Sequence, residues 1–193
     1  ARTALSYVNF GRVQTYGFDA SVSYAFTRQI SGLINYSYFG YSLDQDDLAN
    51  DGNNDGRIDV NDLPINTPAN KLGVGLNYTG NRFFVGLFGR WVQAYDFFSG
   101  INVAAATNEN LIYAGGLVIE GRRVGTSFNN GPLGGFFNLD VSLGYKFGKY
   151  LTVSGQVVNV LNAEVREFIA SPAIAPLYSV EVKVDLPALG AKR

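Results

Sequence analysis

The fold is decided by the segment Phe137-Asn-Leu-Asp-Val-Ser-Leu-Gly-Tyr-Lys-Phe147. Every second residue from Phe137 to Phe147 is apolar, and the residues between them are polar, charged or glycine. A period of two is typical of a β-strand with one apolar and one polar face. Such a strand is also long enough to cross the hydrocarbon core of a membrane, which takes about 9–11 residues.

The same alternation recurs along the chain. It is clear in Phe18–Phe26, Leu72–Tyr78 and Val180–Leu186. No stretch keeps the 3.6-residue period of an amphipathic helix. We therefore predict an all-β fold with antiparallel strands at 12–26, 30–43, 71–79, 83–97, 136–147, 151–162 and 177–186, and a further candidate strand at 3–9.

The connections between these strands form two length classes that strictly take turns. The tight connections are 27–29, 80–82 and 148–150, and the long ones lie near 44–70, 98–135 and 163–176. Outer-membrane barrels combine short periplasmic turns with long outer loops, whereas a soluble β-sandwich has no reason to sort its loops by end. We therefore predict that residues 1–193 are a segment of an antiparallel transmembrane β-barrel with seven or eight strands.

Aromatic residues on the apolar face support a membrane-spanning sheet. One set lies beside the tight turns, a second lies at the other strand ends, and aliphatic residues and glycine lie between them. This order is typical of two aromatic girdles that flank an apolar band. The turn-end set is Tyr24, Phe26, Tyr78, Phe83, Tyr145, Phe147 and Tyr150, and the other set is Tyr36, Tyr38, Trp91, Tyr95 and Phe137.

The alternation also assigns each residue to a face. A charge that faces lipid near the midplane costs about 2–4 kcal/mol, so the charged residues of the strands are expected to point into a lumen. We predict that Val22, Leu76, Leu87, Val141, Leu143, Val153 and Val182 face lipid. We predict that Ser21, Asn77, Asp140, Ser142 and Lys183 face inward.

Composition removes several classes of function. The chain has no His and no Cys, which excludes thiol chemistry and weakens every His-based triad of an outer-membrane hydrolase. The net charge of −1 gives no reason to expect a nucleic-acid partner. No apolar run reaches the length of a membrane helix. We predict that the protein is not an enzyme.

Three segments resemble the late barrel of TonB-dependent outer-membrane receptors. Tyr7–Asp19 leads into an alternating strand, Asn66–Leu72 resembles the segment that returns from an outer loop, and Gln156–Asn162 resembles the penultimate strand. The family usually has an aromatic residue near Val165, and this chain does not. The resemblance covers almost the whole chain and corresponds to about the last third of such a receptor.

The resemblance implies nutrient uptake across the bacterial outer membrane through a plugged barrel. It implies as partners outer-membrane lipid, the remainder of the barrel with its plug, and a TonB-type energy-coupling protein. The plug and the TonB-contacting box are not in this sequence, and a Pro187–Arg193 tail stands where the family tends to end on an aromatic residue. We therefore expect the C-terminal part of a larger barrel, which would form an open arc. The alternative is a complete eight-stranded barrel with a structural or adhesive role, whose first and last strands would pair.

The loop 51–62 fits the calcium-loop pattern D-x-[DN]-x-[DN]-G with an acidic twelfth residue. Its spacing predicts a structural calcium site held by side-chain or backbone oxygens. Gly56 would permit the sharp turn between the ligands. The alternative is an Asn/Gly-rich outer loop that only mimics the motif. The predicted ligands are Asp51, Asn53, Asp55, Arg57 through its carbonyl, Asp59 and Asp62.

Four other features are given structural interpretations. The glycine-rich stretch 131–135 lacks the helix and the Lys-Ser/Thr pair of a phosphate loop. Arg122-Arg123 is interpreted as part of a solvated loop. Asp44, Asp46 and Asp47, beside the calcium motif, are interpreted as solvated residues or as accessory calcium ligands. Asn159 and Asn162 are expected to organise a strand end.

Overall fold

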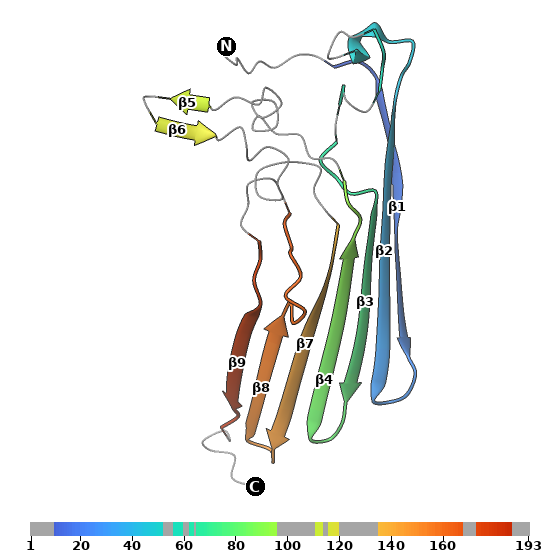
Figure 1. Cartoon of the computed structure of the whole chain (residues 1–193). Coiled ribbons are helices and arrows are strands. Elements are labelled where there is room, and N and C mark those ends of the chain that lie inside the picture. Colours follow the sequence, from blue (N-terminus) through green and yellow to red (C-terminus); the bar gives the residue numbers. More distant parts are fainter. Residues whose placement is uncertain are drawn as a thin grey trace.

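The computed structural model describes residues 10–51, 56–59, 62–63, 65–95, 111–113, 116–119, 135–167 and 173–186, with the backbone alone at 111–119. Its main feature is one antiparallel sheet of seven strands in the order β1-β2-β3-β4-β7-β8-β9 (Figure 1). The strands are β1 Val13–Ala25, β2 Ile30–Leu43, β3 Asn70–Thr79, β4 Phe83–Val92, β7 Phe136–Phe147, β8 Leu151–Val158 and β9 Leu177–Val184. Among the described residues, no helix has the length and apolar character needed to cross a membrane.

All seven predicted main strands are confirmed, with two corrections at their ends. β4 ends at Val92 and not at 97, and β8 ends at Val158 and not at 162. β8 stops because Asn159 has a left-handed backbone with a φ of 55°, which leaves the extended conformation. The candidate strand at 3–9 lies outside the described residues.

Two small elements were not predicted. A hairpin of β5 Leu111–Tyr113 and β6 Gly116–Ile119 lies within the 98–135 connection, and a 3-10 turn, η1, covers Leu48–Asn50. Runs this short contain too few residues for a period to be read from the sequence. The two classes of connection are confirmed, since all three tight turns lie at one end of the sheet (Figure 1).

The strand register confirms the predicted assignment of faces. Leu76 pairs with Leu87 and Leu87 with Val141, so these three side chains share a face. Asn77 pairs with Gly86 and Gly86 with Ser142, one residue along, so this row lies on the opposite face. We call the face that carries Leu76 the outer face and the face that carries Asn77 the inner face. Asp140 shares the inner face and Leu143 the outer face, as predicted.

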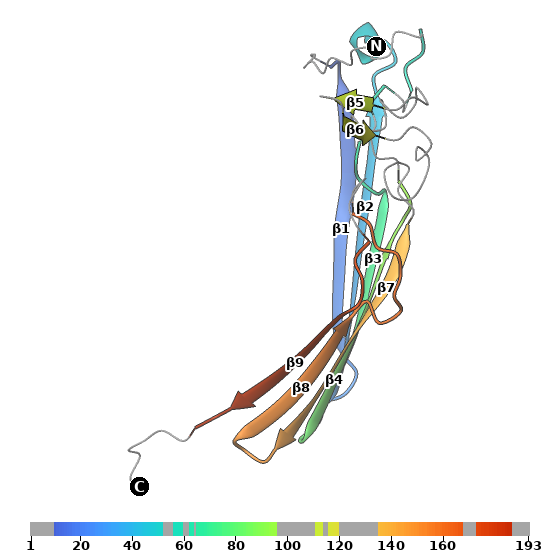
Figure 2. The same ribbon diagram turned by 60° about the vertical axis from the view of Figure 1, so that its left-hand side comes forward.

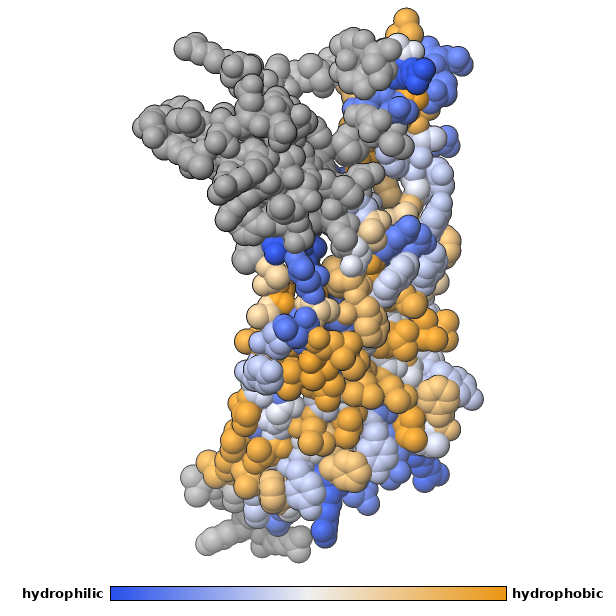
Figure 3. Space-filling model, in the orientation of Figure 1, coloured by the Kyte–Doolittle hydropathy of each residue, from blue (hydrophilic) through white to orange (hydrophobic). Residues whose placement is uncertain are grey.

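The outer face has no protein layer over it in the described part of the chain. Figure 2 shows the sheet as a single curved layer, and Figure 3 shows apolar side chains gathered over its strands. Val22 is 64% exposed and Val180 is 78% exposed. Buried apolar residues of the described part are limited to Val92, Phe136 and Val165. A single sheet with so little core needs an apolar solvent on its outer face, and a bilayer provides one.

The aromatic residues lie in two groups on this outer face. Beside the tight turns, ring centroids are 5.1 Å apart in the pair Tyr24–Phe26 and 4.7 Å apart in the pair Tyr145–Phe147. Toward the other end, Phe18 lies 5.7 Å from Tyr36. The order predicted from the sequence, with aliphatic residues between two aromatic groups, is therefore present in the fold.

The sheet is open. β1 and β9 are its two edges, and each has one strand neighbour. This is the open arc expected of a receptor segment, and the described residues do not show the first-to-last pairing of a small barrel. Both edge strands carry exposed apolar residues on the outer face, Val22 among them in β1 and Val180 in β9.

Candidate functional site: the inner face and the outer loop

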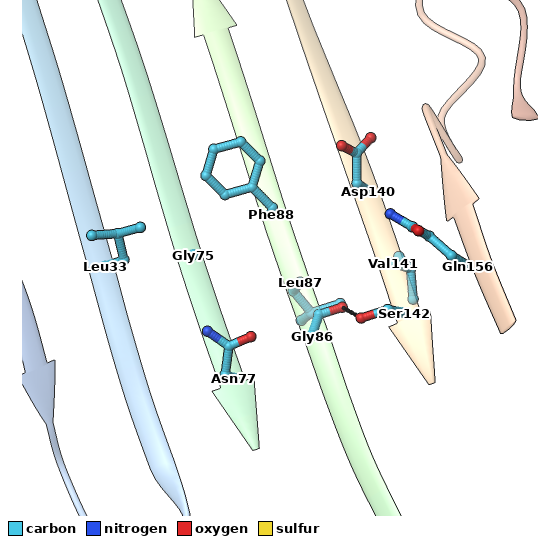
Figure 4. A pocket seen from close by; sticks show the side chains of 10 residues that line it. All are labelled: Leu33, Gly75, Asn77, Gly86, Leu87, Phe88, Asp140, Val141, Ser142 and Gln156. Atoms are coloured by element: carbon cyan, nitrogen blue, oxygen red, sulfur yellow. Dashed lines mark hydrogen bonds between the residues drawn. The ribbon is translucent and has the colours of Figure 1, made fainter. Parts of the chain in front are cut away.

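The inner face carries a shallow hollow of about 290 Å³ between β2 and β8. Gly75 and Gly86 place no side chain there, while Asn77, Phe88 and Asp140 stand around the space (Figure 4). The Ser142 hydroxyl donates to the Gly86 carbonyl at 3.4 Å. The hollow combines amide, carboxylate and hydroxyl groups with one aromatic ring, which is a polar lining that water or another polar surface can fill.

A chain of hydrogen bonds crosses the inner face above this hollow. Arg90 Nε donates to Asn138 Oδ1 at 3.3 Å, and Asn138 Nδ2 donates to Asp140 Oδ1 at 3.1 Å. Asn138 is only 4% exposed, so these bonds satisfy a buried amide. Arg90 also forms a 3.5 Å ion pair with Glu167 and lies 5.1 Å from the centre of the Phe136 ring. Arg90 and Asp140 therefore both have partners on the inner face.

Asn159 is the centre of the strand end that follows β8. Its amide Nδ2 donates to the carbonyls of Ala163 and Ile174, each at 2.9 Å, and its Oδ1 accepts from Ala163 N at 2.9 Å. Its backbone N–H donates to Asp140 Oδ1 at 2.8 Å. The residue is 1% exposed. Asn159 thus ties the end of β8, the turn after it and the segment before β9 to Asp140 of β7, which confirms its predicted role.

A tyrosine joins two of the long connections. Tyr95 Oη donates to the Glu167 carbonyl at 2.9 Å, although the two residues belong to different loops. Burial and, second, the Glu167 carboxylate raise the pKa of the Tyr95 phenol above its ordinary value of 10.0. The phenol therefore stays protonated and keeps its role as a donor at any physiological pH.

The loop with the calcium motif contains two short-range contacts. Gly56 N–H donates to Asp51 Oδ2 at 2.9 Å, and Gly56 has a φ of 81°, which the motif glycine permits. Asp59 N–H donates to Asp62 Oδ2 at 2.7 Å. Asn53 and Asp55 lie outside the described residues. Within the described part of the chain, no three His, Cys, Asp or Glu residues converge as a metal site, so the calcium site remains a prediction.

The base of this loop is fixed to the start of β1, which the sequence did not predict. Asn50 is fully buried, and its Nδ2 donates to the Arg12 carbonyl at 3.0 Å and to the Asp44 carbonyl at 2.8 Å. Arg12 N–H donates to Asp47 Oδ2 at 3.0 Å, and the Arg12 guanidinium lies 3.3 Å from Asp44. Asp44 and Asp47 therefore have a structural role that differs from the predicted solvated or accessory one. Arg122-Arg123 and residues 131–134 lie outside the described residues.

Comparison with known proteins agrees with this geometry. The family described as TonB dependent receptor-like, beta-barrel matches residues 1–160. A solved structure, the copper transporter OprC, superposes with a TM-score of 0.51 at 14% identity, over 89% of this chain and 23% of that one. No curated protein matches the sequence significantly. The fold of this chain is therefore similar to part of OprC, and the chain spans about a quarter of the OprC length.

The family match, the open amphipathic sheet and the sorted connections agree with one another. The family consists of receptors of the bacterial outer membrane and is not an enzyme family. This chain belongs to the TonB-dependent receptor β-barrel family.

Proposed function

We propose that this chain is part of the barrel wall of a receptor that takes up a scarce nutrient across the bacterial outer membrane. The wall would enclose a plug, and a TonB-type protein would supply energy from the inner membrane. In this role the chain is structural and not an enzyme. The observation that carries the proposal is the open sheet, which has an apolar outer face, a polar inner face and two unpaired edges.

Unpaired edges are the reason for proposing a larger barrel. Nothing in the bilayer core can bind a backbone N–H or C=O group, so each unsatisfied group costs several kcal/mol there. β1 and β9 both carry apolar outer residues and both lie at edges. Further strands must therefore pair with both, and the small share of OprC that this chain covers agrees with that requirement.

The test uses the intact protein in its native membrane. We expect it in the outer-membrane fraction as a polypeptide several times heavier than the 20.9 kDa of this chain. In cells limited in turn for ferric siderophores, cobalamin, peptides and glycans, growth on one of these should require both the receptor and the TonB-type protein. A mature polypeptide near 20.9 kDa, with no dependence on the TonB-type protein, would support a small structural barrel in its place.

We also propose that the loop 51–62 binds one calcium ion that orders the outer mouth of the barrel. The support is the motif spacing, together with two contacts in which Asp51 and Asp62 turn back toward backbone N–H groups of their own loop. Asp51, Asn53, Asp55 and Asp62 would supply side-chain oxygens, Arg57 its carbonyl, and Asp59 an oxygen directly or through water. Asn50 would hold the loop base in place for this site.

Calcium should protect the loop from proteolysis. In the intact protein, cleavage near Asn54 should slow at about millimolar calcium, because extracellular sites of this chemistry bind at about 10⁻⁴–10⁻³ M. The double variant Asp51→Ala, Asp55→Ala should lose the protection. Glu164→Ala changes an exposed carboxylate in a different connection, so it is the matched control and should keep the protection. Equal cleavage with calcium and with chelator would show that the loop only mimics the motif.

A further inference from the structure

Two cations have neighbouring backbones at the tight-turn end of the sheet: Lys146 on the inner face of β7, and Arg82 in the turn that precedes β4. Phe83 pairs with Tyr145, and the next step of the ladder is a hydrogen bond of 2.6 Å from Lys146 N–H to the Arg82 carbonyl. The Arg82 backbone therefore lies beside that of Lys146, and the register of Lys146 continues through Thr152 to Lys183. We call Arg82 and Lys146 the lumenal cation pair.

The lumenal cation pair has no counter-charge in the described part of the chain. Lys183, in the same row, has one, since its Nζ lies 3.2 Å from Asp185. Neither Arg82 nor Lys146 forms an ion pair or a side-chain hydrogen bond with any described residue. Like charges on neighbouring positions of adjacent strands and turns repel each other. The wall alone therefore leaves an unfavourable interaction that an anion would relieve.

The position of the pair restricts which anion can reach it. At this end of the sheet the outer face carries the aromatic group of Tyr145, Phe147 and their neighbours. Lys146 lies on the other side of β7, so the sheet separates its side chain from lipid phosphates. A side chain that enters from the lumen is not blocked in this way.

We propose that Arg82 and Lys146 bind a carboxylate, an Asp or Glu side chain, of the domain that fills the barrel in the intact receptor. The proposal rests on the proposed function, which places a plug against this wall. Arg82 can hold the carboxylate with two parallel N–H···O bonds while Lys146 adds a point charge. The contact would fasten the plug to the wall at the periplasmic end of the sheet, beside the β3–β4 and β7–β8 turns.

A zero-length cross-link tests this contact in the purified intact receptor. A carbodiimide activates a carboxylate, the Lys146 amine displaces the activating group as a urea, and an amide remains. Peptide mass spectrometry should find Lys146 joined to an Asp or Glu outside the barrel wall. The link should be absent in Lys146→Gln and reduced at least tenfold in Arg82→Gln. Links only to Glu181 or Asp185, links only between two receptor molecules, or no link at all would overturn the proposal.

The sign of a stability change provides a second readout. Arg82→Gln with Lys146→Gln should lower the Tm of the intact receptor if the pair holds a carboxylate. If the pair faces only water, the same change removes repulsion and should raise the Tm or leave it unchanged, which contradicts the proposal. The control is Arg28→Gln, which removes one positive charge from an exposed turn residue at the same end and should keep both the link and the Tm.

Growth that depends on the TonB-type protein is measured separately in the same strains. If that dependence holds and no Lys146 link forms, the carboxylate contact is wrong and the proposed function stands. If the dependence is absent and the intact protein has no domain inside the barrel, both proposals fail.

Discussion

Replacing Leu76 by arginine should strongly lower the stability of the intact, folded protein in lipid vesicles. Leu76 lies on the outer face of β3, is 46% exposed and pairs with Leu87, an aliphatic residue between the two aromatic groups. An arginine that faces lipid near the bilayer midplane costs about 2–4 kcal/mol, which is about a 30- to 900-fold change in the folding equilibrium. The loss of folding free energy is measured by urea titration of the barrel in vesicles, with the folded fraction read from its heat-modifiable electrophoretic mobility.

The neighbouring residue supplies the control. Asn77 is on the same strand and is also exposed, but its side chain lies on the inner face beside the polar hollow. Asn77→Arg should shift the urea midpoint by much less than Leu76→Arg, because its charge stays in a wet lumen. Equal losses for the two variants would mean that the two faces meet the same solvent, and the membrane assignment of the sheet would be wrong.

The assignment of faces could be predicted because it depends on a short-range pattern. Side chains alternate across a strand whatever its partners are, so Leu76 and Asn77 are separated by the sequence alone. The tight and long connections then give the antiparallel order, because a two- or three-residue turn can join only antiparallel neighbours. Strand ends are different. β8 ends at Val158 because the next residue, Asn159, has a left-handed backbone and bonds to Asp140 and Ile174, which no local pattern reveals.

The contacts between distant segments were missed for the same reason. Asn50 is held by the Arg12 carbonyl and Arg90 pairs with Glu167, and both contacts join residues far apart in the sequence. The proximity of Arg82 to Lys146 likewise appears only once the register of β4 and β7 is known. The calcium motif differs from these contacts, because its pattern is local and can be recognised in the sequence. Its coordination geometry depends on Asn53 and Asp55, which lie outside the described residues.

Replacing Asn159 by alanine should cause the largest loss of stability on the inner side of the wall. The change removes one acceptor and two donated bonds, and it leaves Ala163 N–H and the carbonyls of Ala163 and Ile174 without their partner. Each buried group that loses its partner costs about 1–3 kcal/mol, so the total should reach about 3–5 kcal/mol after partial relaxation. Alanine is also less favourable than asparagine at a φ of 55°, because it lacks the short polar side chain that can hydrogen-bond locally in the left-handed conformation.

Two further variants separate the hydrogen bonds of Asn159 from its backbone conformation. Asn159→Gly tolerates the positive φ and removes the same side chain, so it should lose nearly as much stability as the alanine variant if the hydrogen bonds dominate. Asn162 has a similar φ of 50° but is exposed, so Asn162→Ala should cost only about 1 kcal/mol, the cost of backbone strain. Urea midpoints of the intact protein in vesicles give the three values. If Asn159→Gly is as stable as the wild type while Asn159→Ala and Asn162→Ala lose the same amount, backbone conformation alone explains the asparagine, and the hydrogen bonds that join β7, β8 and β9 do not stabilise this end of the wall.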